Sequence, residues 1–305
     1  MHIYYSDVFS FPLPENHRFP GSKYALLRKR IAAAFPDHSP NLILSPAAPD
    51  QDLLLVHDGE YLTKVLYGNL SPKEVRRIGF PWSQELVTRS RHSVGGTIAA
   101  SRQVLQRGGF AFNIAGGTHH AFPDHGEGFC IFNDVAVAAR VVQSELLAQN
   151  ILILDLDVHQ GNGTAAIFAG DPTVFTLSVH NGKNFPFHKE HSSLDIALPD
   201  GAGDAEYIGA VKRGLFNALE GFAPDLVIYL AGADPYSGDK LGRLTVSKTG
   251  LTARDDHIFS LLLVQRIPTA VVLAGGYAQD IHIRLISILI PWKAHSDIFG
   301  RTKSS

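Results

Sequence analysis

The sequence predicts an α/β protein with a parallel, multi-stranded sheet and helices on both of its faces. Short apolar runs rich in Val, Ile, Leu and Phe alternate with longer stretches of helical periodicity. Several of the short runs are apolar throughout, which is typical of strands buried on both faces. No repeat, low-complexity tract or linker divides the 305 residues, so a single domain over residues 1–305 is the simplest expectation.

The elements follow from these runs in chain order. Strands are predicted at residues 2–5 (HIYY), 110–115 (FAFNIA), 151–157 (ILILDLD), 174–179 (VFTLSV), 226–231 (LVIYLA) and 269–274 (TAVVLA). Helices are predicted at 94–106, 134–149, 205–219 and 252–266, with Asn133 or Asp134 as the cap of the second. Strand and helix alternate, which favours right-handed crossovers. Residues 181–203 contain two prolines and several glycines, so we expect a long functional loop there.

Composition excludes several classes of protein. A hydrophobic share of 45% supplies a buried core, and a net charge of −2 gives no electrostatic case for nucleic acid or an anionic membrane as partner. The only cysteine, Cys130, rules out an internal disulfide framework and indicates a reducing compartment. No segment approaches the roughly 18 apolar residues that a membrane span needs. We therefore expect a cytoplasmic protein.

Polar groups follow four of the predicted strands. They are AGGTHH at 115–120, DLDVHQGNG at 155–163, AGADPYSGD at 231–239 and AGGY at 274–277. Open parallel sheets bind ligands beyond the carboxyl ends of their strands. One edge of the sheet is thus expected to collect the chemistry.

A metal site is predicted at that edge. Asp155, Asp157 and His159 stand at alternate positions and project to one side if the extended chain continues to residue 159. Carboxylate and imidazole suit zinc or ferrous iron, and Asp234, after the small residues AGA, is a candidate third ligand. Three ligands from Asp157, His159 and Asp234 leave a position open, which is typical of a hydrolytic metal.

A histidine pair and a tyrosine complete the predicted site. His119 and His120 follow two glycines, and an imidazole beside an activated water acts as general base and then protonates a leaving amine. Asp155 and Asn162 are candidates to orient the two rings. Tyr277 is placed to stabilise an oxyanion on the substrate. Together these groups indicate a metal-dependent amidohydrolase.

The same blocks resemble the histone deacetylase superfamily. The resemblance runs from about the N-terminus to residue 280 through GGTHHAFPDHGEGFCIFNDVAVAA, ILILDLDVHQGNGT, LAGADPYSGDKLGRLTVSKTGL and VVLAGGY. DLDVHQGNG is most similar to the class IV deacetylases and their bacterial relatives. The resemblance implies the arginase/deacetylase fold and a zinc-dependent deacylase. It also implies zinc ligands at Asp157, His159 and Asp234, a catalytic pair at His119 and His120, and a transition-state tyrosine at Tyr277.

Further roles are implied by the same resemblance. Asp155 supports His119, while Asn162 stands where many relatives carry an aspartate supporting His120. An amide stabilises an imidazolium less than a carboxylate does, so the pKa of His120 is expected to be the lower of the two. Phe129, with Gly128 before it, matches a wall of the acyl-lysine channel, and the loop near Phe185 or Phe187 is expected to form the other wall.

The resemblance also bears on a second ion, on the inner end of the pocket and on the C-terminal tail. A monovalent cation, usually potassium, is implied at Asp155, Asp157, His159, Ser178 and Val179, and Lys23 is expected at the inner end of the pocket. The tail at 280–305 does not match the family's usual ending. Residues 1–305 are therefore interpreted as one deacetylase domain with an atypical tail.

The leading hypothesis is a zinc-dependent enzyme that removes acetyl or longer acyl groups from lysine side chains or related amines. An alternative is a deacetylase of acetylpolyamines or other small amides on the same fold. A binuclear manganese ureohydrolase ranks lower, because Gly161 stands where a bridging acid is needed. An inactive acyl-binding protein is the remaining alternative. The sequence indicates no oligomeric state.

The other polar residues have simpler expected roles. Cys130 is expected to be a small buried hydrophobe and no nucleophile. The histidines of the rim loops are expected to be solvated, and three consecutive charged residues are expected to form an exposed helix face. The histidines are His125, His180, His188 and His191, and the charged residues are Arg254, Asp255 and Asp256.

Overall fold

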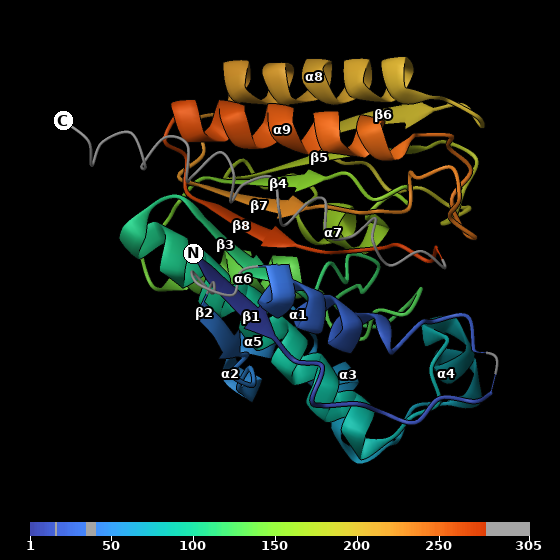
Figure 1. Cartoon of the computed structure of the whole chain (residues 1–305). Coiled ribbons are helices and arrows are strands. Elements are labelled where there is room, and N and C mark those ends of the chain that lie inside the picture. Colours follow the sequence, from blue (N-terminus) through green and yellow to red (C-terminus); the bar gives the residue numbers. More distant parts are fainter. Residues whose placement is uncertain (16, 35–40, 279–305) are drawn as a thin grey trace.

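An all-parallel sheet of eight strands forms the centre of the computed structural model, which describes residues 1–15, 17–34 and 41–278 (Figure 1). The strand order is β2-β1-β3-β8-β7-β4-β5-β6. The strands are β1 (His2–Tyr5), β2 (Asn41–Leu44), β3 (Phe110–Asn113), β4 (Ile151–Asp155), β5 (Val174–Asn181), β6 (Leu194–Leu198), β7 (Leu226–Leu230) and β8 (Thr269–Val272). The predicted α/β class and parallel sheet are confirmed.

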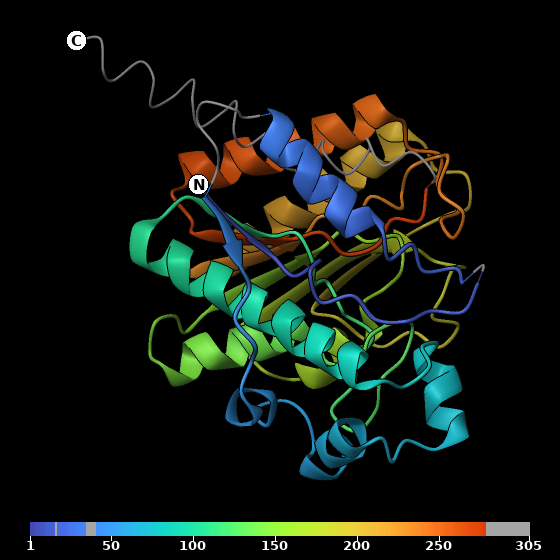
Figure 2. The same ribbon diagram turned by 60° about the horizontal axis from the view of Figure 1, so that its bottom comes forward.

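Helices cover both faces of the sheet. They are α1 (Lys23–Ala34), α2 (Asp50–Leu53), α3 (Gly59–Tyr67), α4 (Pro72–Ile78), α5 (Gln84–Arg107), α6 (Asp134–Ser144), α7 (Asn162–Ile167), α8 (Asp204–Gly221) and α9 (Lys248–Val264). Figure 2 shows α1, α8 and α9 on one side of the sheet and α5 and α6 on the other. Each side buries its own apolar cluster, because parallel strands must be covered on both faces. None of the helices in the described ranges is both long and apolar enough to cross a membrane.

The six predicted strands are present, and the sequence missed two. The missed strands, β2 and β6, are the two edges of the sheet. Most residues of both are partly or fully exposed; the apolar run of β2 is only three residues long, and that of β6 is interrupted by Asp195. The expectation of an unbroken loop at 181–203 is wrong, because β6 lies within it and pairs with β5 from Leu177 to Asn181.

The predicted helices are also present, with different ends. α5 begins at Gln84, ten residues before the predicted start, where the Ser83 side chain accepts a hydrogen bond from the Leu86 N–H at 3.1 Å. α6 is capped by Asn133, whose Oδ1 accepts from the Ala136 N–H, and it ends at Ser144 and not at 149. Amphipathic periodicity locates helix centres well, whereas capping hydrogen bonds fix their ends.

The order of the strands brings the polar segments together. β3, β8, β7 and β4 are consecutive neighbours in the sheet. His119 and His120 follow β3, Tyr277 follows β8, Asp234 follows β7, and His159 follows β4. All of these segments begin at the carboxyl ends of their strands. Because every strand runs in the same direction, these ends lie on the same side of the sheet.

Two expectations for surface residues are wrong. Arg254 and Asp255 are fully buried in α9, where Arg254 Nε donates to Asp255 Oδ1 at 2.8 Å. Arg254 Nη1 also donates to the Gly232 carbonyl at 2.6 Å, in the loop that leads from β7 to Asp234. His180 is buried in β5, where its Nδ1 lies 3.0 Å from Ser178 Oγ. Nothing in the sequence indicated this burial, because several of the hydrogen-bond partners lie far away in the chain, such as Gly232 for Arg254 and Tyr229 for Asp255.

Replacing Arg254 is expected to destabilise the protein strongly. Arg254→Met leaves the Asp255 carboxylate buried without its cation, and breaking a buried pair in this way costs about 3–5 kcal/mol of unfolding free energy. Urea denaturation measures this loss. Arg213→Met, at an exposed arginine of α8, is the matched control and is expected to stay within about 0.5 kcal/mol of the parent. Equal stability of the two variants would contradict the prediction.

Candidate active site

Three buried side chains converge just beyond β4 and β7. Asp157, His159 and Asp234 each offer one ligand atom, and these atoms lie within 4.8 Å of one another. His159 Nδ1 lies 2.9 Å from Asp157 Oδ1 and 3.3 Å from Asp234 Oδ2. Two carboxylates and one imidazole are a donor set that borderline divalent ions such as zinc and ferrous iron accept. The structure therefore brings together the three residues that the sequence predicted as ligands.

The charge balance of this cluster fits a bound cation. Asp234 Oδ2 is buried and accepts no hydrogen bond from the described residues, although its Oδ1 accepts from the Val158 N–H at 2.9 Å. Burial and the neighbouring Asp157 raise the pKa of Asp234 to about 7. The two carboxylates therefore repel each other in a dry site, and a divalent ion between them removes this penalty.

Two glycines leave room for the carboxylates. A Cβ at Gly275 would overlap the Oδ2 atoms of both Asp157 and Asp234, and a Cβ at Gly232 would overlap the backbone of Asp157. The Gly275 N–H also donates to Asp157 Oδ2 at 2.6 Å. Gly275 thus fixes one ligand and lets the backbone approach both.

A methyl group at position 275 is expected to expel the metal. Gly275→Ala pushes Asp157 and Asp234 from their places, so the affinity of the site for added zinc is expected to fall by more than about 100-fold, beyond the 10- to 100-fold cost of losing an outer hydrogen bond. Elemental analysis after dialysis measures zinc per chain. Gly221→Ala is the matched control, because no described atom lies within 4 Å of the added Cβ. Full zinc content in Gly275→Ala would contradict the prediction.

His119 and His120 lie side by side next to the cluster, with ring centroids 4.0 Å apart. His119 Nδ1 lies 2.6 Å from Asp155 Oδ2, and His120 Nδ1 lies 2.7 Å from Asn162 Oδ1. The sequence predicted both of these contacts. A carboxylate oxygen and an amide oxygen only accept hydrogen bonds, so each ring donates through Nδ1. Its Nε2 therefore points away from Asp155 or Asn162.

The two imidazoles differ in basicity. Burial opposes protonation of His119, but the charges of Asp155 and Asp157 outweigh it and raise the pKa of His119 to about 9. Burial and the charges of His119 and His159 hold the pKa of His120 well below its usual value. The expected order of the two pKa values is confirmed, since Asn162 supplies no charge to His120.

Glu127 is a neighbour of this pair that the sequence analysis did not identify. Asn162 Nδ2 donates to Glu127 Oε2 at 3.4 Å, which directs the amide oxygen of Asn162 toward His120. Residues 127 and 162 meet through the tertiary fold, and no local pattern marks their contact.

Tyr277 and Phe129 both line the cavity, with ring centroids 6.2 Å apart and ring planes tilted by 45°. The Tyr277 N–H donates to Asp239 Oδ2, which holds the backbone at this turn. Burial and the charges of Asp157 and Asp234 raise the pKa of Tyr277 well above its usual value, so the phenol keeps its proton. Phe129 and the preceding Gly128 both have positive φ, and a Cβ at Gly128 would overlap His120 and Phe185.

The loop after β5 contributes Phe185 and not Phe187. The Phe185 ring lies edge-on to His120 with centroids 4.9 Å apart, whereas Phe187 is 80% exposed. At the implied potassium position, Asp155 of β4 and Ser178 of β5 are register partners, and Val179 follows. The tail at 280–305 lies outside the described residues.

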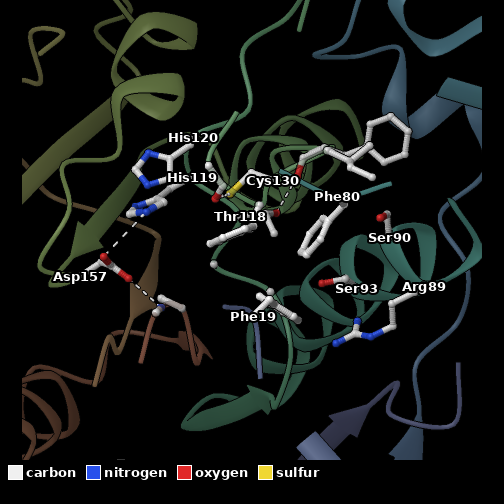
Figure 3. A pocket seen from close by; sticks show the side chains of 18 of the residues that line it. Phe19, Phe80, Arg89, Ser90, Ser93, Thr118, His119, His120, Cys130 and Asp157 are labelled. Carbon is white, nitrogen blue, oxygen red and sulfur yellow. Dashed lines mark hydrogen bonds and ion pairs between the residues drawn. The ribbon is translucent and has the colours of Figure 1, made fainter. Parts of the chain in front are cut away.

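Asp157, His159, His119, His120, Phe129 and Tyr277 all line one cavity of about 80 Å³, shown in Figure 3. Asp157, His119 and His120 lie at one end, and Arg89, Ser90 and Ser93 of α5 at the other. Lys23 also lines the cavity, as the resemblance implied. Arg89 was missed, although Leu86, Arg89 and Ser93 are spaced by three and four and so share the buried face of α5. Cys130 is buried, and burial raises the pKa of its thiol well above its usual value, as expected for a non-nucleophile.

A buried Asp-His-Asp cluster at the carboxyl edge of a parallel sheet, next to paired imidazoles, defines a hydrolytic α/β enzyme with a metal centre. Residues 17–290 match the model of the histone deacetylase domain. The chain therefore belongs to the histone deacetylase family of deacetylases and amidohydrolases, and family membership implies an acylated substrate.

Known proteins agree with this assignment. A protein of Picosynechococcus sp. described as uncharacterized is 45% identical over 298 residues, which cover 97% of this chain and 98% of that protein. Histone deacetylase 2 of Arabidopsis thaliana is 31% identical over 287 residues, covering 90% of this chain and 73% of that protein. The crystal structure of a histone deacetylase homologue from Aquifex aeolicus has the same fold, with a TM-score of 0.80 at 24% identity over 95% of this chain and 83% of that chain.

Proposed function

We propose that this protein is a zinc-dependent deacylase that hydrolyses N-acyl amides, with acyl-lysine side chains or related acylated amines as substrates. The observation that carries this proposal is that Asp157 and His159, two of the three converging ligand residues, line one cavity with His119, His120 and Tyr277. Zinc or ferrous iron held by the cluster supplies Lewis acidity, which polarises a carbonyl and acidifies water. The substrate's amide bond is hydrolysed to a carboxylate and an amine.

His120 is assigned the role of general base. Its Nδ1 donates to Asn162 Oδ1, so the lone pair of the neutral ring is on Nε2 and accepts the proton of the attacking water. His119, whose Nδ1 donates to the Asp155 carboxylate, carries positive charge and supplies a proton to the leaving amine. Asp155 and Asn162 thus position the two rings.

Tyr277 is assigned to the oxyanion. Its phenol stays protonated and donates a hydrogen bond to the substrate oxygen as negative charge develops there. Tyr277→Phe is expected to lower kcat by about 10²- to 10³-fold with zinc content unchanged. Steady-state hydrolysis of an acetyl-lysine peptide measures kcat, and Tyr67→Phe, at a tyrosine that is 73% exposed, is the matched control. A kcat equal to that of the parent would remove Tyr277 from the mechanism.

The remaining assignments concern the channel and a second ion. Phe129 and Gly128, which line the cavity, form one wall of the acyl-lysine channel, and Phe185, edge-on to His120, forms the other. Potassium is assigned to Asp155, Asp157, His159, Ser178 and Val179, through their backbone carbonyls. We also propose that residues 1–305 form one domain and that the protein is cytoplasmic.

Acetylpolyamines and other small amides are the second candidate substrates, because the same chemistry serves any N-acyl amine. A binuclear manganese ureohydrolase is less well supported, because a Cβ at Gly161 would overlap Asp155 Oδ2 and leaves no room for a bridging acid. The catalytic positions are all present, which argues against an inactive acyl-binding protein.

The test is a panel of acyl-lysine peptides and acylpolyamines, assayed on the zinc-loaded protein with and without a chelator. We expect hydrolysis that the chelator abolishes and that zinc restores, with one metal ion per chain by elemental analysis. Hydrolysis of acylpolyamines alone would select the second candidate. Two ions per chain would favour the ureohydrolase, and the absence of any hydrolysis by the zinc-loaded protein would favour the binding protein.

A further inference from the structure

The cavity continues past the metal cluster into an inner chamber, defined by Phe19, Lys23, Tyr24, Phe80 and Arg89. In Figure 3, Phe19 and Phe80 lie between Asp157 at one end and Arg89 at the other. Because the chamber and the metal cluster belong to one cavity, a group bound in the chamber is part of the molecule that reacts at the metal or is released from it.

Arg89 brings a buried positive charge to the end of this chamber that lies away from the metal cluster. The Arg89 residue is 8% exposed, and within the described ranges its guanidinium donates one hydrogen bond, from Nη1 to Ser6 Oγ at 2.7 Å. No carboxylate of the described residues lies within 4 Å of it. A guanidinium has five N–H donors in a planar fork that matches a carboxylate. The donors that Ser6 does not take are available to a ligand.

A second cation reinforces this charge. Lys23 is 3% exposed, and its Nζ lies 4.8 Å from the centroid of the Tyr24 ring, while Arg89 Cζ lies 4.8 Å from the same centroid. Lys23 Nζ also lies 5.3 Å from the centroid of Tyr277, so the positive region reaches toward the reacting groups. Among the lining residues that the structure describes, the one acidic side chain is Asp157, at the metal cluster.

The walls between the two ends are aromatic, and the space is small. Phe19 and Phe80 pack edge to face with centroids 5.0 Å apart, and Phe11 lies against Phe80 at 5.1 Å. Such walls suit methylene groups and not water. A cavity of about 80 Å³ holds a few water-sized groups, which is too small for a long acyl chain. The chamber thus fits a short chain that is apolar along its length and anionic at its end.

We propose that the inner chamber selects short acyl groups that end in a carboxylate, such as succinyl, with Arg89 binding the terminal carboxylate. This inference rests on the proposed deacylase function and names its acyl specificity. Water adds to the amide carbon of a succinyl-lysine, the C–N bond breaks, and the lysine amine takes the proton while succinate is released. No further reactant is needed. Arg89 is a specificity residue here, since it contacts the far end of the acyl group.

The experiment compares succinyl-lysine and butyryl-lysine peptides of one sequence on the zinc-loaded full chain, with acetyl-lysine as reference. Succinyl and butyryl have four carbons each and differ in the terminal carboxylate. We expect kcat/KM for the succinyl peptide to exceed that for the butyryl peptide by about 10-fold or more, as a charge-assisted hydrogen bond provides.

Two variants of α5 assign this preference to Arg89. Arg89→Met keeps the length of the side chain and removes the charge, so the ratio of the two kcat/KM values is expected to fall by about 10- to 100-fold. Replacing a buried charge by an apolar group of similar size is compatible with folding. Arg107→Met, at an exposed arginine at the end of the same helix, is the matched control and is expected to keep the parent ratio.

Three results would overturn the inference while leaving the deacylase function intact. They are hydrolysis of acetyl and butyryl peptides with no preference for succinyl, an equal loss on both substrates in Arg89→Met, and an unchanged ratio in Arg89→Met with weaker product inhibition by free acetate. The last result would mean that the chamber holds only the released acid. Failure of all three peptides on zinc-loaded protein would instead refute the proposed function.

Discussion

His120→Ala is expected to lower kcat by about 10²- to 10⁴-fold, the usual contribution of a general base, while zinc stays bound. His120 donates to Asn162 and is outside the group of three converging ligand atoms, so its removal leaves the metal cluster complete. The measurements are single-turnover hydrolysis of an acetyl-lysine peptide and elemental analysis for zinc. Together they separate a loss of proton transfer from a loss of metal.

A surface histidine provides the control for this experiment. His191→Ala removes an imidazole that is exposed, and its kcat is expected to equal that of the parent. If His120→Ala kept full turnover, the base would have to be His119 or another group. If His120→Ala lost its zinc, the residue would belong to the metal cluster, and the assigned role would be wrong.

Asp234→Asn is expected to abolish zinc binding and, with it, hydrolysis. The amide keeps the shape of the side chain and can still accept the hydrogen bond from the Val158 N–H. It replaces the buried anionic Oδ2, which accepts no hydrogen bond from the described residues, with a neutral group. Zinc affinity is expected to fall by more than about 100-fold, since even outer-shell changes cost 10- to 100-fold.

Asp225→Asn is the matched control for the ligand variant. Asp225 stands at the start of β7, the same strand that Asp234 follows, and accepts hydrogen bonds from the N–H groups of Gln149 and Asn150. An amide oxygen serves there as well, so zinc content and kcat are expected to be unchanged. Zinc bound at the parent level in Asp234→Asn would exclude this carboxylate as a ligand.

The central part of the fold was accessible from the sequence. Strands buried on both faces are continuous apolar runs, and β3, β4, β5, β7 and β8 were all predicted from such runs. The edge strands β2 and β6 were not predicted, because a strand with one free edge keeps polar and exposed positions. The sequence analysis interpreted the buried pair of Arg254 and Asp255 as a solvated face, since charge alone does not reveal the hydrogen bonds that the two residues make to Gly232 and Tyr229 outside α9.

The amino-acid sequence by itself determined which chemical groups follow each strand, because the alternation of Asp155, Asp157 and His159 and the pairing of His119 with His120 are local along the chain. Tertiary structure alone decided that the segments after β3, β8, β7 and β4 are neighbours. It also decided that Glu127 contacts Asn162 and that Arg89 lines the cavity at the end away from Asp157. These contacts join residues far apart in the chain, and they depend on how the helices and strands pack, which no spacing within one segment specifies.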